Sequence, residues 1–370
     1  MFASFLFALL LSSSQAAPFL PTSSPLASTL SSLRGGAPLL QDSAFAELDE
    51  ARDFLDECDG SCRAFPVTVS PLSPTGPTDR PMDASEWAGK NREALDKLLP
   101  QHGAVLLRGF RVPSEREFSE FVKALGYEEQ PYLGGNAVRR VVADRVFTSN
   151  ESPPSERIPF HHEMAQAPEF PSKVMFYCKE PSSEGGETPI VLSFEVCKVL
   201  REQFGELYER FKAEGVRYIR TMPEDDDAES ALGRGWKSTY MVETREACEE
   251  EMRTAGTEWE WLENGDLKTT SKVLSAIRDV DGKEVFFNQV IAAFTGWNDK
   301  RNVSTKAIVF GESRETLPAA EMKKLIKKTD QLSVAFEWEQ GDILVIDNRL
   351  AMHSRKPFVK PRVVLASLAR

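Results

Sequence analysis

The sequence has few histidines and few cysteines, and this limits the chemistry it can support. Of its 370 residues, four are His and five are Cys. The cysteines are odd in number and form no C-x-x-C pair, which argues against a disulfide framework and against a structural zinc site. Any histidine chemistry must therefore use members of one small set: His102, His161, His162 and His353.

Positive charge is also scarce. The chain has 45 Lys and Arg against 57 Asp and Glu, for a formal net charge of −12. A broad basic surface for nucleic acid or for an anionic membrane is therefore not expected. The sequence contains neither a G-x-G-x-x-G nor a P-loop pattern, so the common phosphate-binding loops are missing. With 41% hydrophobic residues, the chain still has ample material for a folded core.

The N-terminal segment 1–41 differs from the rest of the chain. It contains no Asp, Glu or Lys, and its apolar run Phe5 to Leu11 is too short to anchor a protein in a bilayer. Small residues up to Ala17 suit signal-peptidase cleavage, and a Ser/Thr/Pro-rich stretch follows. We interpret 1–41 as a presequence that resembles the bipartite leaders of secondary plastids. Simple secretion is the alternative, and Asn302-Val303-Ser304 would then be a possible glycosylation acceptor.

The remainder, 42–370, shows no repeat and no long Gly/Ser linker, which predicts a single domain. Many short apolar strands are separated by turns, and few long parallel crossovers connect them. This pattern predicts an α+β chain with a mainly β core, a β-sandwich or jelly roll decorated by helices. Among the expected elements are helices over Ser43 to Cys58, Ala84 to Leu99 and Glu115 to Leu125, and strands over Leu332 to Trp338 and Ile343 to Asp347.

The densest chemical signal is the segment Ile158 to Met164, where His161 and Glu163 stand two residues apart. On an extended segment both side chains leave the same face. An imidazole and a carboxylate there can take adjacent positions on a metal. A second imidazole would complete a facial triad with three open positions, an arrangement that suits non-haem Fe(II). Alone the pattern is weak, because a His followed two residues later by an acid is common by chance.

Three later residues strengthen this interpretation. His353 stands beyond the polar end of a predicted buried strand. Arg362 opens the final apolar strand, where a guanidinium can clamp a carboxylate, although by itself a rim arginine in a surface pair is the better interpretation. Thr188 follows the Gly185-Gly186 turn and can offer its hydroxyl to the same carboxylate, with a simple hairpin threonine as the alternative.

Together these residues resemble the clavaminate synthase-like branch of the taurine dioxygenase (TauD/TfdA) family, whose members depend on Fe(II) and 2-oxoglutarate. The resemblance covers roughly Phe65 to Leu368. It is carried by stretches much longer than the triad pattern: Phe160 to Gln166, Gly185 to Ser193, Gly233 to Thr239, Ala292 to Trp297, Asp299 to Asn302, and His353 to Arg362.

The resemblance implies a double-stranded β-helix with Fe(II) held by His161, Glu163 and His353, and 2-oxoglutarate held by Thr188 and Arg362. It also implies a 2-oxoglutarate-dependent dioxygenase that uses O2 to hydroxylate, desaturate or cyclise a small substrate, amino-acid-like or a carboxylate, with release of succinate and CO2. Arg355 is a further candidate for anchoring 2-oxoglutarate or substrate, and a surface ion pair is its alternative.

Candidate substrate residues are polar or aromatic side chains near these motifs: Asn150, Arg234, Trp236 and Asn288. For each of them, loop capping or core packing explains the residue equally well. Two other classes of function stay open, namely a non-catalytic jelly-roll metal-binding protein and a regulatory 2-oxoglutarate sensor. The expected partner is a small molecule, and the sequence does not indicate an oligomeric state.

Overall fold

The computed structural model describes residues 40–56, 60–72, 80–132, 134–149, 152–227, 229–230 and 232–370. Asn150 and most of the expected presequence lie outside the described residues. The strands are β1 (Ser43–Ala46), β2 (Arg52–Leu55), β3 (Cys62–Phe65), β4 (Val67–Pro71), β5 (Ala104–Leu107), β6 (Val141–Ala143), β7 (Val146–Thr148), β8 (Ile158–His161), β9 (Lys173–Glu180), β10 (Ile190–Leu192), β11 (Val216–Met222), β12 (Glu258–Trp261), β13 (Leu267–Thr270), β14 (Arg278–Val280), β15 (Lys283–Val285), β16 (Ile308–Phe310), β17 (Ile343–Asp347), β18 (Ala351–Arg355) and β19 (Val363–Ala369). The helices are α2 (Ala84–His102), α3 (Glu115–Leu125), α4 (Ser193–Gln203), α5 (Gly205–Glu214), α6 (Trp236–Tyr240), α7 (Arg245–Ala255), α8 (Val290–Gly296) and α9 (Ala319–Leu332), with a short 3-10 turn at Ser304–Lys306.

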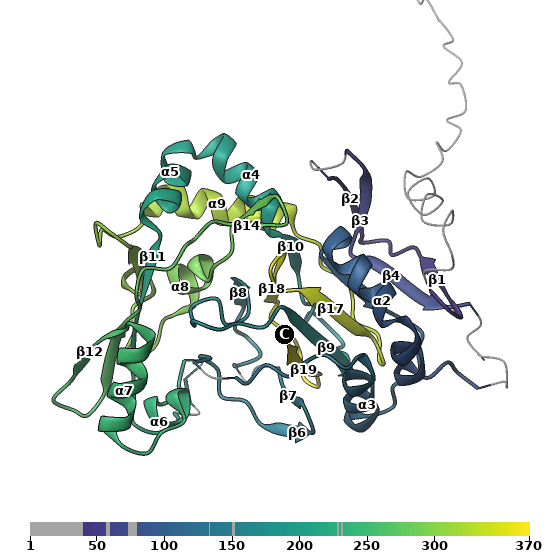
Figure 1. The fold of residues 1–370 in the computed structure, drawn as a ribbon, viewed down its shortest axis with the longest axis horizontal. Helices are drawn as coiled ribbons and strands as arrows, with labels where there is room; N and C mark the ends of the chain where they lie inside the picture. Colours follow the sequence, from purple (N-terminus) through teal and green to yellow (C-terminus); the bar gives the residue numbers. More distant parts are fainter. Residues whose placement is uncertain are drawn as a thin grey trace, which may run out of the picture.

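Two sheets form the centre of the molecule (Figure 1). The larger has eight strands in the order β1-β4-β5-β17-β9-β19-β7-β6, and its neighbours pair antiparallel except β4 with β5. The smaller has the order β10-β18-β8. Along β17, Ile343 and Val345 pack in the cluster beneath α2 and α3, whereas Leu344 and Ile346 pack with residues of the smaller sheet. Burial on both faces explains why this strand is apolar almost throughout.

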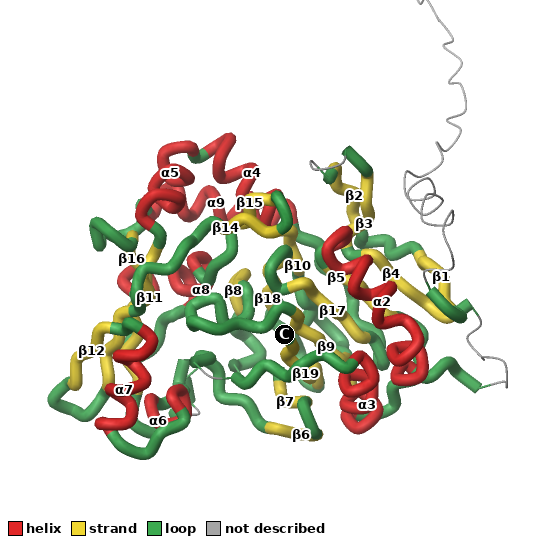
Figure 2. Tube along the Cα trace, viewed as in Figure 1, coloured by secondary structure: helices red, strands yellow, loops and turns green. Residues whose placement is uncertain are grey.

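Helices cover the outer faces of both sheets, as the coloured tube in Figure 2 shows. The outward side chains of the smaller sheet, Phe160, Val191 and Met352, join a core cluster with α4, α5, α8 and α9. Because side chains alternate along a strand, the residues next to Phe160 and Met352 point the other way, toward the larger sheet. Those residues are His161 and His353. The layering therefore directs two of the four histidines into the space between the sheets.

Two predicted elements are wrong. Within the described part of Ser43 to Cys58 the chain forms β1 and β2 rather than a helix, because β1 pairs with β4 and β2 with β3. Short apolar runs fit both periods, and pairing decides between them. The strand predicted over Leu332 to Trp338 is also absent, since α9 runs to Leu332 and only a single bridge joins Val334 to Ile190.

The predicted helix over Ala84 to Leu99 is present and longer, because α2 continues through Pro100 and ends at Gly103, which has a positive φ of 72°. The architecture is thus mixed, with helices around a large, mainly antiparallel sheet. Across the described ranges, the structure contains no helix with the length and hydropathy needed to cross a membrane.

Candidate active site

Strand pairing places His161 and His353 side by side. In the antiparallel pair β8–β18 these two residues stand directly opposite each other, and their imidazole centroids are 4.3 Å apart. On the other side of β18, His353 pairs with Ile190 of β10. His353 is therefore fixed from both neighbouring strands, and the register of the smaller sheet determines where both rings lie.

Glu163 completes a cluster with these histidines. One potential ligand atom from each of His161, Glu163 and His353 lies within 4.8 Å of the others. His161 Nδ1 is 2.8 Å from the carbonyl oxygen of Pro159, so its Nε2 remains for a ligand. Burial lowers the pKa of both imidazoles, and the neighbouring His161 lowers that of His353 further. Two neutral imidazoles and one carboxylate are a donor set that fits a divalent iron ion.

Asn348, a residue that the sequence interpretation did not identify, holds the backbone of Glu163. The Glu163 N–H donates to Asn348 Oδ1 at 2.8 Å, and Asn348 Nδ2 donates to the Glu163 carbonyl oxygen at 3.1 Å. The same Nδ2 also donates to the carbonyl oxygen of Pro171 at 2.8 Å. Asn348 is completely buried at the end of β17. This side chain therefore fixes the turn that presents the carboxylate.

Arg362 and Thr188 also meet, as the sequence suggested. Arg362 Nη2 donates to Thr188 Oγ1 at 3.4 Å, and Arg362 Nε donates to the carbonyl oxygen of Gly186 at 2.7 Å. Gly186 has a φ of +79°, and a Cβ there would lie 2.7 Å from Arg362 Cδ. Burial, followed by the charge of Arg355, lowers the pKa of Arg362 to about 10. The guanidinium is thus still charged at neutral pH.

A small cavity of about 40 Å³ joins these two groups of residues. His161, Glu163, His353, Thr188 and Arg362 all line it. Arg355 lines it too, but its Nη atoms donate to the carbonyl oxygens of Ser152, Pro153 and Glu156. Arg355 therefore ties the 152–156 loop to β18.

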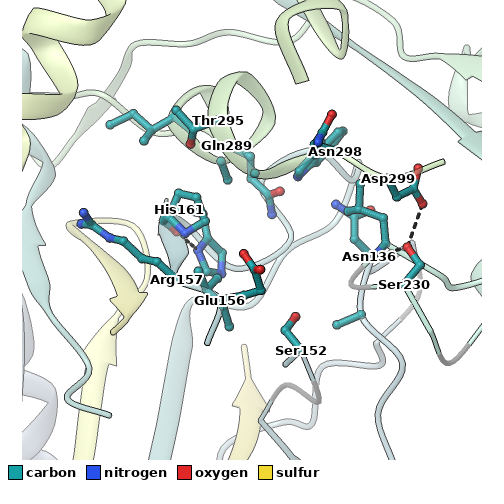
Figure 3. Close-up of a pocket in the computed structure, with 18 of the residues that line it drawn as sticks. Asn136, Ser152, Glu156, Arg157, His161, Ser230, Gln289, Thr295, Asn298 and Asp299 are labelled. Carbon is teal, nitrogen blue, oxygen red and sulfur yellow. Dashed lines mark hydrogen bonds between the residues drawn. The ribbon is translucent and has the colours of Figure 1, made fainter. Parts of the chain in front are cut away.

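A larger cavity of about 780 Å³ adjoins the small one. His161, Glu163 and Arg139 line both cavities, so the two meet at the candidate metal site. Figure 3 shows the larger cavity, with the Glu156 carboxylate directed into the space between His161 and Asn136. Most of the other lining residues come from loops and from α8, and Gln289 stands at the start of that helix.

The described residues that we predicted to contact substrate do not line either cavity. The guanidinium of Arg234 donates to the carbonyl oxygens of Tyr132, Gly135 and Ser238, which ties two loops together. Trp236 is buried against Trp261.

Asn288 is also buried, and it bonds to His162, the residue that follows the candidate ligand His161. Its side chain caps α8 through Val290 N–H, and its backbone N–H donates to His162 Nδ1 at 3.1 Å. His162 Nε2 lies 2.7 Å from Ser193 Oγ, and burial lowers the pKa of this imidazole to about 3. Asn302, the possible glycosylation acceptor under the secretory alternative, is buried as well, and its amide bonds to Thr221 and Asp299, so the folded chain does not present it.

The sequence interpretation also missed Arg139, whose Nη2 donates to Glu163 Oε2 at 2.9 Å. It is one of two adjacent arginines in the run Val138 to Val142. Two arginines inside an otherwise apolar segment could have indicated a functional residue. The sequence alone does not show which of the two is buried.

The chain is similar to known proteins along most of its length. Residues 68–368 match the model of the family described as taurine catabolism dioxygenase TauD, TfdA family. The chain is 43% identical over 313 residues to a clavaminate synthase-like protein of Arabidopsis thaliana, covering 83% of this chain and 94% of that protein. It is 28% identical over 303 residues to the dapdiamide synthesis protein DdaC of Enterobacter agglomerans, covering 77% and 88%.

Among solved structures, one similar chain is PvcB, described as an Fe, alpha-ketoglutarate dependent oxygenase from an isonitrile synthetic pathway. It has a TM-score of 0.47 and 14% identity, with 88% of this chain and 93% of that chain covered. The family match spans most of the sequence and the Arabidopsis relative is similar along nearly its whole length. The chain therefore belongs to the taurine catabolism dioxygenase (TauD, TfdA) family.

Proposed function

We propose that this protein is an Fe(II)- and 2-oxoglutarate-dependent dioxygenase that hydroxylates, desaturates or cyclises a small amino-acid-like or carboxylate substrate. The observation that carries the proposal is the small cavity, where a His-Glu-His cluster within 4.8 Å stands beside a buried arginine bonded to a threonine hydroxyl. A protein that only stores metal has no need of the arginine and threonine. Family membership supports the same chemistry.

The roles of the residues follow from their chemistry. His161, Glu163 and His353 would hold Fe(II) from one side and leave its remaining positions to other ligands. Arg362 and Thr188 would bind one carboxylate of 2-oxoglutarate through charge-assisted hydrogen bonds. When bound, iron, 2-oxoglutarate and O2 supply the oxidation of a substrate C–H bond, with release of succinate and CO2. Arg355 and Asn348 would position the 152–156 loop and Glu163.

Succinate formation tests the proposal. The purified protein is incubated in air with 2-oxoglutarate, with or without Fe(II) and ascorbate, and with a panel of amino acids and small carboxylates. We expect succinate that requires Fe(II) and increases with at least one panel member. Iron binding without succinate under any condition would instead favour a non-catalytic metal-binding protein.

We further propose that residues 42–370 form one oxygenase domain with a double-stranded β-helix. The face-to-face packing of the two sheets supports this proposal.

We also propose that residues 1–41 are a presequence for a plastid. The absence of acidic residues from this segment supports the proposal. A fusion of residues 1–41 to a fluorescent protein tests the destination, and a secreted reporter would contradict it.

A further inference from the structure

Arg139 stands where the two cavities meet. Its side chain is 9% exposed, and it lines both the small cavity and the larger one. The guanidinium carbon lies 4.1 Å from the ring centroid of Tyr132 and 4.9 Å from that of Phe147. Contact with two aromatic rings holds a guanidinium in place without using its hydrogen-bond donors. Arg139 is therefore fixed at the entrance to the candidate metal site.

The hydrogen bonds of Arg139 are incomplete. Its Nη2 donates to Glu163 Oε2, but its Nε and Nη1 are buried and have no hydrogen-bond partner in the described part of the chain. A buried donor without a partner is costly, and more so when it carries charge. A ligand acceptor that reached these donors from the junction of the two cavities would remove this cost.

The other cations that the structure describes around the larger cavity are already paired. Arg157 forms an ion pair with Asp330, and its side chain extends away from the cavity centre in Figure 3. Lys300 pairs with Asp227 at 2.8 Å. Arg139 also has a carboxylate neighbour, Glu163. In the proposed function Glu163 is a metal ligand, so its negative charge would be neutralised in part by the metal rather than by Arg139 alone.

Charge balance then favours an anion beside Arg139. This step rests on the proposed function. A divalent ion and the dianion 2-oxoglutarate would offset each other, as would Glu163 and Arg362. Within the small cavity, where Glu163 is the one acidic lining residue among the described residues, the charge of Arg139 would then have no counter-charge, and an uncompensated charge in such a confined site is unfavourable. Arg355, whose donors serve loop carbonyls, adds to the positive potential.

We infer that Arg139 binds a carboxylate of the substrate and so holds the substrate next to the metal site. The substrate class is then small carboxylic acids, amino acids included, in their ionised form. The corresponding primary amides lack the charge and are excluded. Arg139 acts in addition to Arg362, which serves the carboxylate of 2-oxoglutarate at the other end of the small cavity.

The test measures binding under anaerobic conditions. Calorimetry first establishes that the wild-type protein binds Fe(II) and 2-oxoglutarate. Thermal-shift titrations of the loaded protein then use the standard L-amino acids, acetate, propanoate and the primary amide of each acid. We expect at least one free acid to bind while its amide does not, and Arg139→Gln to weaken that acid by roughly tenfold or more, since the lost bonds are charge-assisted. Arg157→Gln is the matched control and should bind the acid as the wild type does.

Each other outcome is informative. If the wild-type protein does not bind Fe(II) and 2-oxoglutarate, the proposed function fails at the calorimetric step, before any acid is added. If it binds them but no free acid binds, or amides bind as well as acids, the inference about Arg139 is wrong. The same follows if Arg139→Gln weakens 2-oxoglutarate and leaves the acid unaffected. Should Arg139→Gln melt early, Arg139→Lys replaces it, because it keeps the charge beside Glu163 and loses the planar set of donors.

Discussion

The two adjoining cavities are built from different kinds of structure. Most residues of the small cavity stand on paired strands or within two residues of a strand: His161 ends β8, His353 is inside β18, and Arg362 directly precedes β19. The larger cavity is lined mostly by loops and by α8. Strand register fixes the positions of His161 and His353, whereas the residues of the larger cavity depend on how several loops pack. We expect the small cavity to determine the reaction and the larger one to select the substrate.

The largest effect should follow from removing a histidine of the small cavity. In His353→Ala the donor set falls to one imidazole and one carboxylate, which leaves too few protein ligands to hold Fe(II). We expect iron binding and Fe(II)-dependent succinate formation to be lost, as measured by calorimetry and by succinate assay. His161→Ala should behave in the same way. Normal turnover in either variant would overturn the metal site.

The next effect concerns 2-oxoglutarate. Arg362→Ala removes a charge-assisted hydrogen-bond donor, an interaction worth about 1.5–3 kcal/mol, or roughly a tenfold to hundredfold rise in the 2-oxoglutarate requirement. Iron affinity should change little, because Arg362 contacts Thr188 and Gly186 rather than the metal cluster. The concentration dependence of succinate formation measures this. A variant that lost iron instead would show that the two ends of the cavity are not separate.

Gly186→Ala should reproduce the effect of Arg362→Ala in weaker form. A methyl group there would meet Arg362 Cδ at 2.7 Å and shift the guanidinium, in addition to the strain of a positive φ. Gly282→Ala is the matched control, since Gly282 has a φ of +84° and open space around its Cβ position. Both variants should lose about 1–2 kcal/mol of unfolding free energy. Only Gly186→Ala should raise the 2-oxoglutarate requirement, and an equal rise in both would refute the steric explanation.

The sequence predicts the regular elements of the molecule better than it predicts the residues on its loops. Helix α3 begins and ends where its amphipathic pattern predicts, because Ser114 caps its start and Gly126 ends it. The strand β17 also has its predicted bounds, since an apolar run buried on both faces is unambiguous there. Local pattern was sufficient in both cases. The two-residue spacing of His161 and Glu163 was weak by itself, and it is the structure that brings both residues together with His353.

The rest required tertiary structure. Asn348 bonds to Glu163 across 185 positions in the sequence, and no local pattern marks that contact. Arg139 and Arg140 are equivalent in sequence, and packing on Tyr132 and Phe147 determines which of them is buried. Arg234 and Trp236 stand in a polar and aromatic cluster that resembles a substrate site, but their side chains connect loops and fill a core. The sequence interpretation thus fails where a residue's role depends on contacts between segments far apart in the chain.

A substitution in the larger cavity should have the smallest effect on iron and 2-oxoglutarate binding in the small cavity. Glu156→Gln removes a carboxylate that points into the larger cavity, while the backbone carbonyl that Arg355 binds is kept. Because Glu156 is exposed, the unfolding free energy should change by no more than about 0.5 kcal/mol. Iron and 2-oxoglutarate affinities should equal those of the wild type. Binding of panel members that carry an ammonium group should weaken relative to that of simple carboxylates, because the variant loses the opposing charge. A drop in iron affinity would show that the cavities act as one site, and the division between reaction and selection would then be wrong.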